Sequence, residues 1–300
     1  MGKNAFNINK GLLKGSLILL ICFGIFNFLN FMFHFSMARS LSLADYGILA
    51  TLYSILYALS VFTESIQLVI TKYTAKENNK GKLKNIFLKT IKKSSVVSVL
   101  IFALYLVVAL PLSSLLKIEY PLLALNGLAI FLFFLIPVSR GVMQGQKRFG
   151  SLGINMIAES SAKLAFSIFF VYLGWKVYGA VVGTLIASVL AFVFSLIAIK
   201  DILKINEEDA DTKGIYAYTG PAFILSLTVM LFYSIDIIIA KTFFSPELAG
   251  SYAIASILAK TIFWGTQPIS RAMFPLSAQD SDVKNRNKVE PDFIYNSEKL

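Results

Sequence analysis

The chain has 300 residues and a mass of 33.2 kDa, and its composition excludes an ordinary soluble domain. Hydrophobic residues make up 56% of the chain and charged residues 15%, whereas soluble domains carry about 25% charged residues. A single Cys and a single His exclude a disulfide framework, a zinc cluster and a His-based catalytic triad. The mean hydropathy of +0.70 indicates a membrane protein, and the formal net charge of +11 must then be explained by its distribution.

Eight apolar stretches are long enough to cross a membrane as helices. A hydrocarbon core ~30 Å thick needs about 20 apolar residues at ~1.5 Å of rise each. The first stretch exceeds the ~7–15 apolar residues of a signal peptide, so we predict a retained helix. The sequence predicts an all-α, polytopic membrane helix bundle of about eight transmembrane helices. The predicted spans are 15–38, 47–71, 94–116, 121–143, 151–173, 179–199, 219–240 and 249–271.

Basic residues fall mostly on one side of these spans. If the N-terminus is cytoplasmic, 22 of the 28 lysines and arginines, Arg140 among them, lie in cytoplasmic segments and four lie on the opposite side. An excess of this kind follows the positive-inside rule. It predicts a multi-pass protein of the cytoplasmic (cell) membrane with both termini in the cytoplasm. It also explains the positive charge without a nucleic-acid partner.

Residues 72–93 form the most basic segment, with eight lysines and one acidic residue. Apolar residues recur among these lysines at helical spacing, namely Leu83, Ile86, Phe87 and Ile91. This pattern predicts a short interfacial helix that rests on anionic membrane lipid. A substrate-binding loop is the alternative.

A short pattern occurs twice, at an offset of 202–203 residues. The first copy lies between Ala38 and Ala50 and joins the first two spans, and the second lies between Ala240 and Ala253 and joins the last two. Because six spans separate the copies, they would be related by a pseudo-twofold axis along the membrane normal. The predicted segments are a cytoplasmic N-terminus (1–14), a first six-helix lobe (15–199), a cytoplasmic linker (200–218), the first two helices of a second lobe (219–276) and a polar cytoplasmic tail (277–300).

Four predicted helices carry polar side chains along one face. On the second span, Tyr57, Glu64 and Gln67 share such a face, at intervals of seven and three residues. The first, seventh and eighth spans carry similar stripes, and these four helices open the two repeats. We therefore expect them to line a polar cavity between the lobes. The candidate residues on these stripes are Asn27, Asn30, Tyr57, Glu64, Gln67, Asp236, Lys260, Gln267 and Arg271.

Charged side chains at the centre of a membrane helix cost about 2.5–3.5 kcal/mol or more, so they face protein or water. Lys260 lies near the middle of the eighth span and is the leading candidate for a functional cation. Its alternative role is an ion pair with Glu64 or Asp236. Glu159 and Lys163 are four residues apart in the fifth span, which favours a self-neutralising pair. A role of that pair in proton or ion coupling is the alternative.

Several motifs, taken together, resemble those of one transporter family. They are Ala38-Arg39 followed by Asp45-Tyr46-Gly47, the run from Gly141 to Phe149 with Glu159 after it, Ile235-Asp236, the run from Gly250 to Ala253, and Phe274-Pro275. The chain resembles the O-antigen and teichoic-acid exporters, which are lipid-linked oligosaccharide flippases of the multidrug/oligosaccharidyl-lipid/polysaccharide exporter superfamily.

The resemblance implies two six-helix lobes around a central cavity. It also implies alternating access that moves polyprenyl-pyrophosphate-linked oligosaccharide to the outer leaflet, and no cofactor is expected. Because cations suit a pyrophosphate, Lys260, Arg271 and Arg39 are the expected substrate ligands. Glu64 and Asp236 are the expected ion-coupling residues. The family has a complete second lobe, so we expect this chain to be a truncated product or a fragment of a longer frame.

Three other functions compete with this expectation. A cation-coupled drug or metabolite exporter of the same superfamily would need an acidic cavity. A truncated, non-transporting chain could instead pair with other membrane proteins of polysaccharide assembly. A membrane-embedded glycosyltransferase would need acidic clusters at the membrane surface, and the acidic run 207–211 is better explained as a solvated loop. We therefore do not expect an enzyme.

Overall fold

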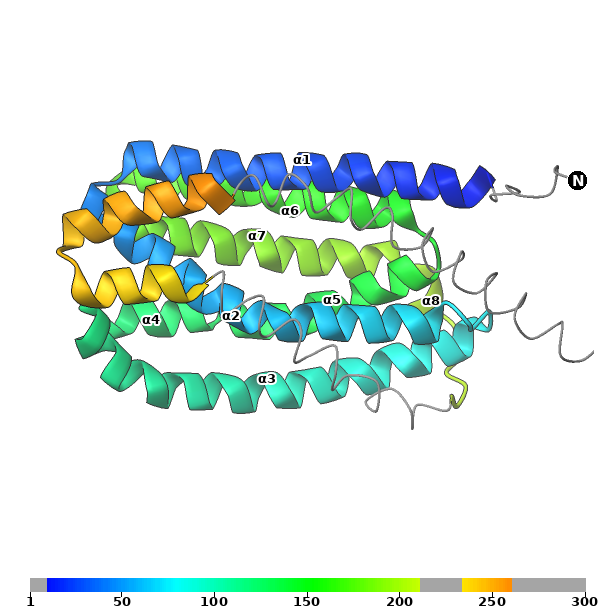
Figure 1. Cartoon of the computed structure of the whole chain (residues 1–300). Helices are drawn as coiled ribbons and strands as arrows, with labels where there is room; N and C mark the ends of the chain where they lie inside the picture. Colours follow the sequence, from blue (N-terminus) through cyan, green and yellow to red (C-terminus); the bar gives the residue numbers. More distant parts are fainter. Residues whose placement is uncertain (1–9, 211–233, 261–300) are drawn as a thin grey trace, which may run out of the picture.

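The computed structural model describes residues 10–210 and 234–260, and every regular element within these ranges is a helix (Figure 1). The elements are α1 (Lys10–Ser40), α2 (Leu43–Thr74), α3 (Lys80–Leu116), α4 (Tyr120–Gly127), α5 (Ala129–Gly145), α6 (Phe149–Phe170), η1 (Val171–Trp175), α7 (Lys176–Ala198) and α8 (Lys200–Leu203). Two further helices, 234–243 and 246–260, form a hairpin.

Five helical stretches in the described residues are long and apolar enough to cross a membrane. The fifth, Phe149–Ala198, is divided by Gly174, whose φ of +87° turns the chain so that α6 and α7 pack against each other. The first six predicted spans therefore match six passes, with α4 and α5 sharing one of them. The polytopic helix bundle is confirmed. The predicted spans 219–240 and 249–271 lie only partly within the described residues.

The long helices run side by side, so the bundle has two ends (Figure 1). The basic end is the one at which α2 ends and α3 begins, and it carries the lysines of 72–93. The far end holds the turn from α1 to α2, the turn at Gly174 and the turn of the 234–260 hairpin. Side-chain caps fix several of these boundaries: Ser42 accepts a hydrogen bond from the Asp45 amide, and Asn79 accepts from the amides of Gly81 and Lys82.

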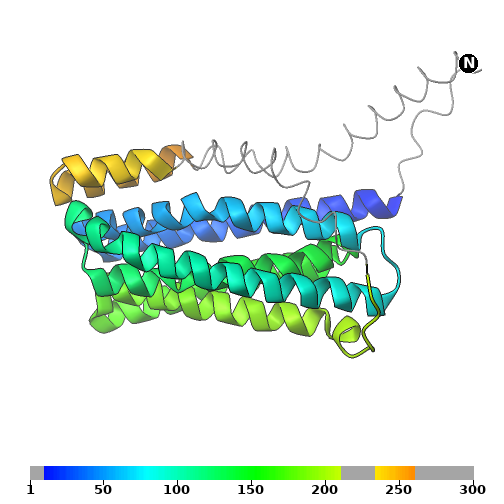
Figure 2. The same ribbon diagram turned by 90° about the horizontal axis from the view of Figure 1, so that it is seen from below.

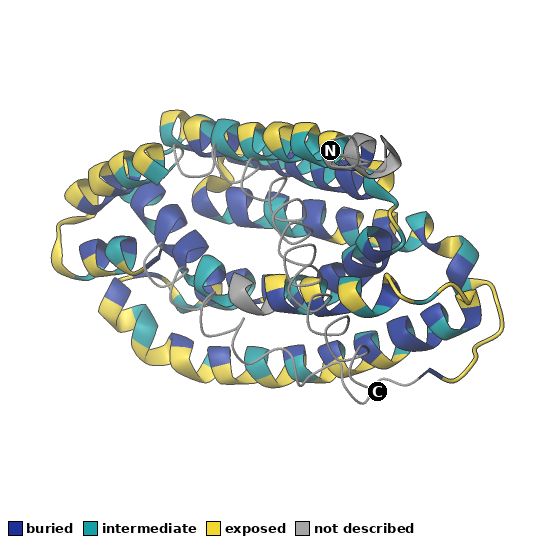
Figure 3. Cartoon of the chain, turned by 45° about the vertical axis from the view of Figure 1, so that its right-hand side comes forward, coloured by how far each residue is buried: buried dark blue, intermediate teal, exposed yellow. Residues whose placement is uncertain are grey.

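Two apolar clusters form the interior. The far-end cluster joins α1, α2, α3, α5 and α7 around Phe33, Met37 and Leu49, and it includes Ile237 and Ala253 of the hairpin. The basic-end cluster centres on residues such as Met143. Apolar side chains also cover the outside of the bundle, where α3 exposes Val96, Val99, Leu100, Leu104 and Val107. Figure 3 shows such exposed faces along the outer helices, as expected of helices that meet lipid.

The start of α3 differs from the sequence prediction. Residues 80–93 are not a separate interfacial helix but the first turns of α3, and their apolar face packs on protein: Leu83, Ile86 and Phe87 are buried. The prediction was wrong because an amphipathic pattern does not say whether its apolar side meets lipid or a neighbouring helix. Here α2, α5 and α8 contribute to the cluster that covers it.

The described part of the acidic run is an exposed loop, as predicted, but it is also bound to α3. The chain from 204 to 210 returns along the first turns of α3. Glu208 accepts a hydrogen bond from Asn79 at 2.8 Å, Glu207 accepts one from Asn85 at 2.7 Å, and Asp209 pairs with Lys89 at 2.7 Å. This loop is therefore docked on the basic end of the bundle while its acidic residues stay exposed.

The two hairpins, α1–α2 and 234–260, turn with the same backbone pattern. The amides of Leu41 and Tyr46 donate to Met37 and Ser42, and the amides 203 positions later, those of Phe244 and Ala249, donate to Ala240 and Ser245. The structural offset is thus 203 in both helices, one more than the sequence match of 38–41 suggests. The second hairpin lies against the far end of the bundle, on the outside of the six helices (Figure 2).

Candidate functional site

A buried cation lies between α6 and α1. Lys163 is 8% exposed and donates a short hydrogen bond to the Asn30 side-chain oxygen. Its Nζ lies 4.5 Å from the centroid of the Phe33 ring and 5.5 Å from that of Tyr53. An amide oxygen and two aromatic faces thus replace part of the hydration that an ammonium group loses on burial. Asn30 and Lys163, predicted as separate candidates, form one site.

Polar side chains continue this site toward the far end. The His34 ring packs edge-on against Phe33 and Tyr53, at centroid distances of 5.1 and 5.4 Å. The Tyr46 hydroxyl lies 3.5 Å from His34 Nδ1, and the Tyr53 hydroxyl lies 2.5 Å from Thr184 Oγ1. We call Lys163, Asn30, Phe33, Tyr53 and His34 the lysine cluster. It links the two helices that open the first repeat to α6 and α7.

A second charged group, between α5 and α6, is neutral overall. Arg140 Nη2 donates to Glu159 Oε2 at 2.7 Å, and Arg140 Nε donates to Asn155 Oδ1 at 2.8 Å. The other oxygen of Glu159 accepts from Ser188 at 3.1 Å. The predicted Glu159–Lys163 pair is therefore wrong. The guanidinium on the facing helix α5 meets the carboxylate directly, while Lys163 turns toward α1.

A third charged group lies in the 234–260 hairpin. Lys260 Nζ lies 2.8 Å from Asp236 Oδ1 and 2.9 Å from Oδ2, and both side chains are partly buried. Ser256 donates to Asp236 Oδ2 at 2.6 Å. Of the two roles that the sequence left open for Lys260, the structure shows the ion pair with Asp236. Asp236 and Ser256 stand 203 positions after Phe33 and Tyr53, whose rings are 5.3 Å apart. Equivalent positions thus make the contact between the two helices of each hairpin.

The other predicted residues are spread over the lobe. Tyr57 lies beside the lysine cluster, with its ring centroid 6.1 Å from that of Tyr53. Gln67 donates to Gln144 Oε1 at 2.8 Å and joins α2 to α5. Arg39 lies over the Phe35 ring at 5.5 Å, Asn27 is half-buried on α1 and Glu64 is exposed on α2. Gln267 and Arg271 lie outside the described residues.

The sequence reasoning missed Arg140 as a membrane charge. It counted this residue with the cytoplasmic segments, although Arg140 lies inside the predicted span 121–143. Its position within the span was the signal that could have identified it. The aromatic partner Phe33 carried no such signal, because phenylalanines occur on every face of the first span.

The family model for polysaccharide biosynthesis proteins matches residues 12–280, which is most of the chain. The chain belongs to this family. It is also 25% identical over 270 residues to an uncharacterized membrane protein of Methanocaldococcus jannaschii, MJ1375, with 84% of this chain and 64% of the relative aligned.

The fold of this family member is that of the MATE transporters. An inward-facing multidrug resistance MATE family transporter of the MOP superfamily matches with a TM-score of 0.68 at 14% identity, covering 93% of this chain and 66% of the transporter. The MATE multidrug transporter DinF-BH matches with a TM-score of 0.65 at 14% identity, covering 92% of this chain and 67% of that transporter. The chain therefore spans about two thirds of the length of these proteins, and it is a multi-pass membrane protein.

Proposed function

We propose that this protein is an exporter that moves a polyprenyl-pyrophosphate-linked oligosaccharide across the cytoplasmic membrane by alternating access. Membership of a polysaccharide biosynthesis family and the transporter fold support an exporter for a glycan intermediate. The chain spans 64% of its relative and 66% of the MATE transporter. Transport of a substrate is therefore proposed rather than taken over from these longer proteins. The excess of lysine at the basic end supports a cytoplasmic position for that end.

The lysine cluster is the observation that favours an anionic substrate. In the described membrane helices, Arg140 is neutralised by Glu159 and Lys260 by Asp236. Lys163, in contrast, has no carboxylate within ion-pair distance among the described residues, and its charge is met by Asn30 and aromatic rings. Together, Lys163, the Arg140–Glu159 pair and the Asp236–Lys260 pair leave one net positive charge, which suits a pyrophosphate and disfavours a cationic drug.

We also propose that the 234–260 hairpin begins a second lobe. Its turn repeats the hydrogen bonds of the α1–α2 turn at an offset of 203, and its second helix contacts the first turn of α2. In such an arrangement the substrate would pass between the two hairpins.

The test measures which leaflet holds the lipid-linked oligosaccharide in cells that lack the gene and carry a plasmid copy. The Lys163→Gln variant should cause accumulation in the inner leaflet, the Lys163→Arg variant should retain part of the export, and the Lys92→Gln variant should export normally because Lys92 is exposed outside the cluster. Normal export by Lys163→Gln at wild-type protein levels would contradict the proposed role of the lysine cluster.

The same deletion strain distinguishes our proposal from the drug-exporter alternative. If deletion leaves the leaflet distribution unchanged but raises the accumulation of a cationic dye, the protein is a drug exporter and our proposal is wrong. If both readouts stay unchanged and the protein copurifies with other polysaccharide-assembly proteins, the assembly-partner role replaces it.

A further inference from the structure

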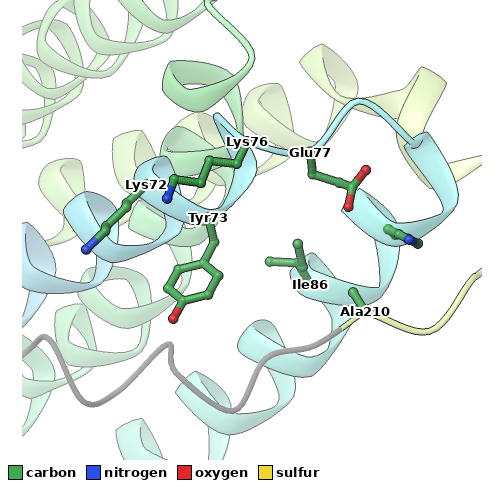
Figure 4. A pocket seen from close by; sticks show the side chains of 7 residues that line it. Lys72, Tyr73, Lys76, Glu77, Ile86 and Ala210 are labelled. Carbon is green, nitrogen blue, oxygen red and sulfur yellow. The ribbon is translucent and has the colours of Figure 1, made fainter. Parts of the chain in front are cut away.

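A pocket of about 500 Å³ opens at the basic end, away from the three charged groups described above (Figure 4). It lies between the last turns of α2, the first turns of α3 and the docked segment that ends at Ala210. Its lining residues are Lys72, Tyr73, Lys76, Glu77, Lys82, Ile86 and Ala210. A volume of this size falls within the ~300–1,000 Å³ range of small-ligand pockets.

The walls of the pocket are fixed by the packing beneath it. Ile86 and Ala210 are 3% and 8% exposed. The Ala210 amide donates to Asn85 Oδ1 at 3.2 Å, which holds the docked segment on α3. Ile86 and Ala210 therefore give the lining a packed, apolar part, and Lys72, Lys76, Lys82 and Tyr73 add three ammonium groups and one phenol.

The acidic residues nearby do not neutralise this pocket. Glu207, Glu208 and Asp209 are bound to Asn85, Asn79 and Lys89 respectively. In the described parts of the chain, Lys76 and Lys82 form no ion pair.

Glu77 is the one carboxylate in the lining, and its Oε1 accepts a hydrogen bond from the Asn79 amide at 2.8 Å. The lining thus carries a net charge of two positives. A site with this excess of ammonium groups favours an anion.

The depth of the pocket matches that of lipid head groups. The exposed apolar face of α3 begins at Val96, which follows Ile86 by ten residues, or ~15 Å along a helix. Ile86 therefore lies ~15 Å beyond the start of this apolar band. Lys72 follows the exposed Leu68 of α2 by four residues, or ~6 Å, so the membrane-facing side of the pocket lies at the level of the lipid head groups.

We propose that this pocket binds the phosphate group of a lipid head group at the basic end. Lys76 and Lys82 would supply the ammonium groups, the Tyr73 hydroxyl would donate a hydrogen bond, and Ile86 would contact the apolar part next to the phosphate. A phospholipid, a polyprenyl pyrophosphate and a free phosphate share this chemistry. The inference does not depend on the proposed transport function.

The experiment measures lipid binding to the purified full chain in a neutral detergent by native mass spectrometry. The probes are dioleoylphosphatidylglycerol, dioleoylphosphatidylcholine and inorganic pyrophosphate. The Lys76→Gln/Lys82→Gln variant is compared with Lys92→Gln/Lys147→Gln, which removes the same charge from exposed lysines outside the pocket. Thermal melting of each variant checks that it is folded.

We expect saturable binding of phosphatidylglycerol, with phosphatidylcholine at least tenfold weaker. The pocket variant should bind phosphatidylglycerol about 30-fold more weakly than wild type, since each lysine near an anionic lipid contributes ~1 kcal/mol or about fivefold. The control variant should lose much less. The Glu77→Gln variant should bind more tightly, because it removes a repelling charge and keeps an oxygen for the Asn79 amide.

Competition by pyrophosphate shows whether the pocket needs an intact lipid or only a phosphate group. Displacement of the lipid by pyrophosphate would show that the phosphate group alone suffices, and its absence would assign the site to an intact lipid; both results support the pocket. An equal loss in the two double variants would show diffuse surface attraction and overturn the proposal. So would the absence of saturable binding to the wild-type chain.

Discussion

Gly47 and Gly250, which stand 203 positions apart, contact each other at the far end of the bundle. A Cβ atom on Gly47 would lie 3.0 Å from the Gly250 nitrogen and 3.1 Å from its Cα. The same offset relates the turn hydrogen bonds of the two hairpins. When equivalent residues of two repeats touch each other, a local twofold axis passes between them. The contact of these glycines is therefore consistent with the predicted twofold relation between the two hairpins.

The first prediction concerns this contact. Gly250→Ala would place a methyl group against the Leu43 carbonyl oxygen, so it should separate the hairpins and lower the free energy of unfolding by about 1–3 kcal/mol. Thermal melting in detergent measures the effect. Gly24→Ala is the matched control, because a Cβ on this helical glycine meets nothing within 4 Å. Equal melting temperatures for both variants would show that the glycine contact is not close-packed in solution.

The second prediction concerns Asp236 and Lys260. Either Asp236→Asn or Lys260→Gln alone should destabilise the protein by about 2–4 kcal/mol, because each leaves a partly buried charge without its counter-charge. The double variant should cost less than the sum of the two. A double-mutant cycle on unfolding free energies gives the coupling. Additive effects on the unfolding free energy would contradict a direct ion pair. If the double variant is folded but does not export, Lys260 or Asp236 has a role beyond the ion pair.

The third prediction separates structure from ion coupling at Glu159. Glu159→Gln should leave the Arg140 guanidinium without its counter-charge and cost about 3–5 kcal/mol of stability. The exposed Glu64→Gln should have little effect on melting. If Glu159→Gln melts like wild type but abolishes export, the Arg140–Glu159 pair is not the main role of this carboxylate.

The fourth prediction is a pH dependence at the basic end. Asp201 accepts two hydrogen bonds from Arg148, at 2.6 and 2.8 Å, and pairs with Lys80 at 2.9 Å. The hydrogen bonds from Arg148, followed by that from Lys80, hold the pKa of the Asp201 carboxyl well below its usual value.

Because this pKa is lower in the folded state, its contribution to stability is complete above the unfolded pKa, which is about 3.9. The contribution is lost as the pH falls below that value. Asp201→Asn should therefore lower the melting temperature at pH 5–8, and the difference from wild type should shrink below about pH 4. Since Asp201 is 40% exposed, we expect at most about 1 kcal/mol. A difference that grows on acidification would contradict this assignment.

The membrane spans of the first lobe and the distribution of charge could be predicted from the amino-acid sequence alone. An apolar window of about 20 residues is a local property, so these spans could be identified without knowing their neighbours. The likeness of the two hairpin turns was also visible in the sequence, since the turns use similar residues at nearly equal spacing. The stripe predicted a polar environment for Asn30, and its side chain indeed accepts a hydrogen bond from Lys163, whereas the predicted cavity between two lobes stays a prediction.

The pairing of the polar side chains, in contrast, emerged only from the packing of the helices. Helical periodicity fixes the face on which a residue lies, but not the helix that this face contacts. For this reason Glu159 met Arg140 rather than the nearer Lys163, and Lys163 met Asn30 and Phe33. The docking of 204–210 on α3, which shapes the lipid pocket, joins residues more than 100 positions apart. Such contacts depend on how the helices pack, and a local sequence pattern carries no information about that packing.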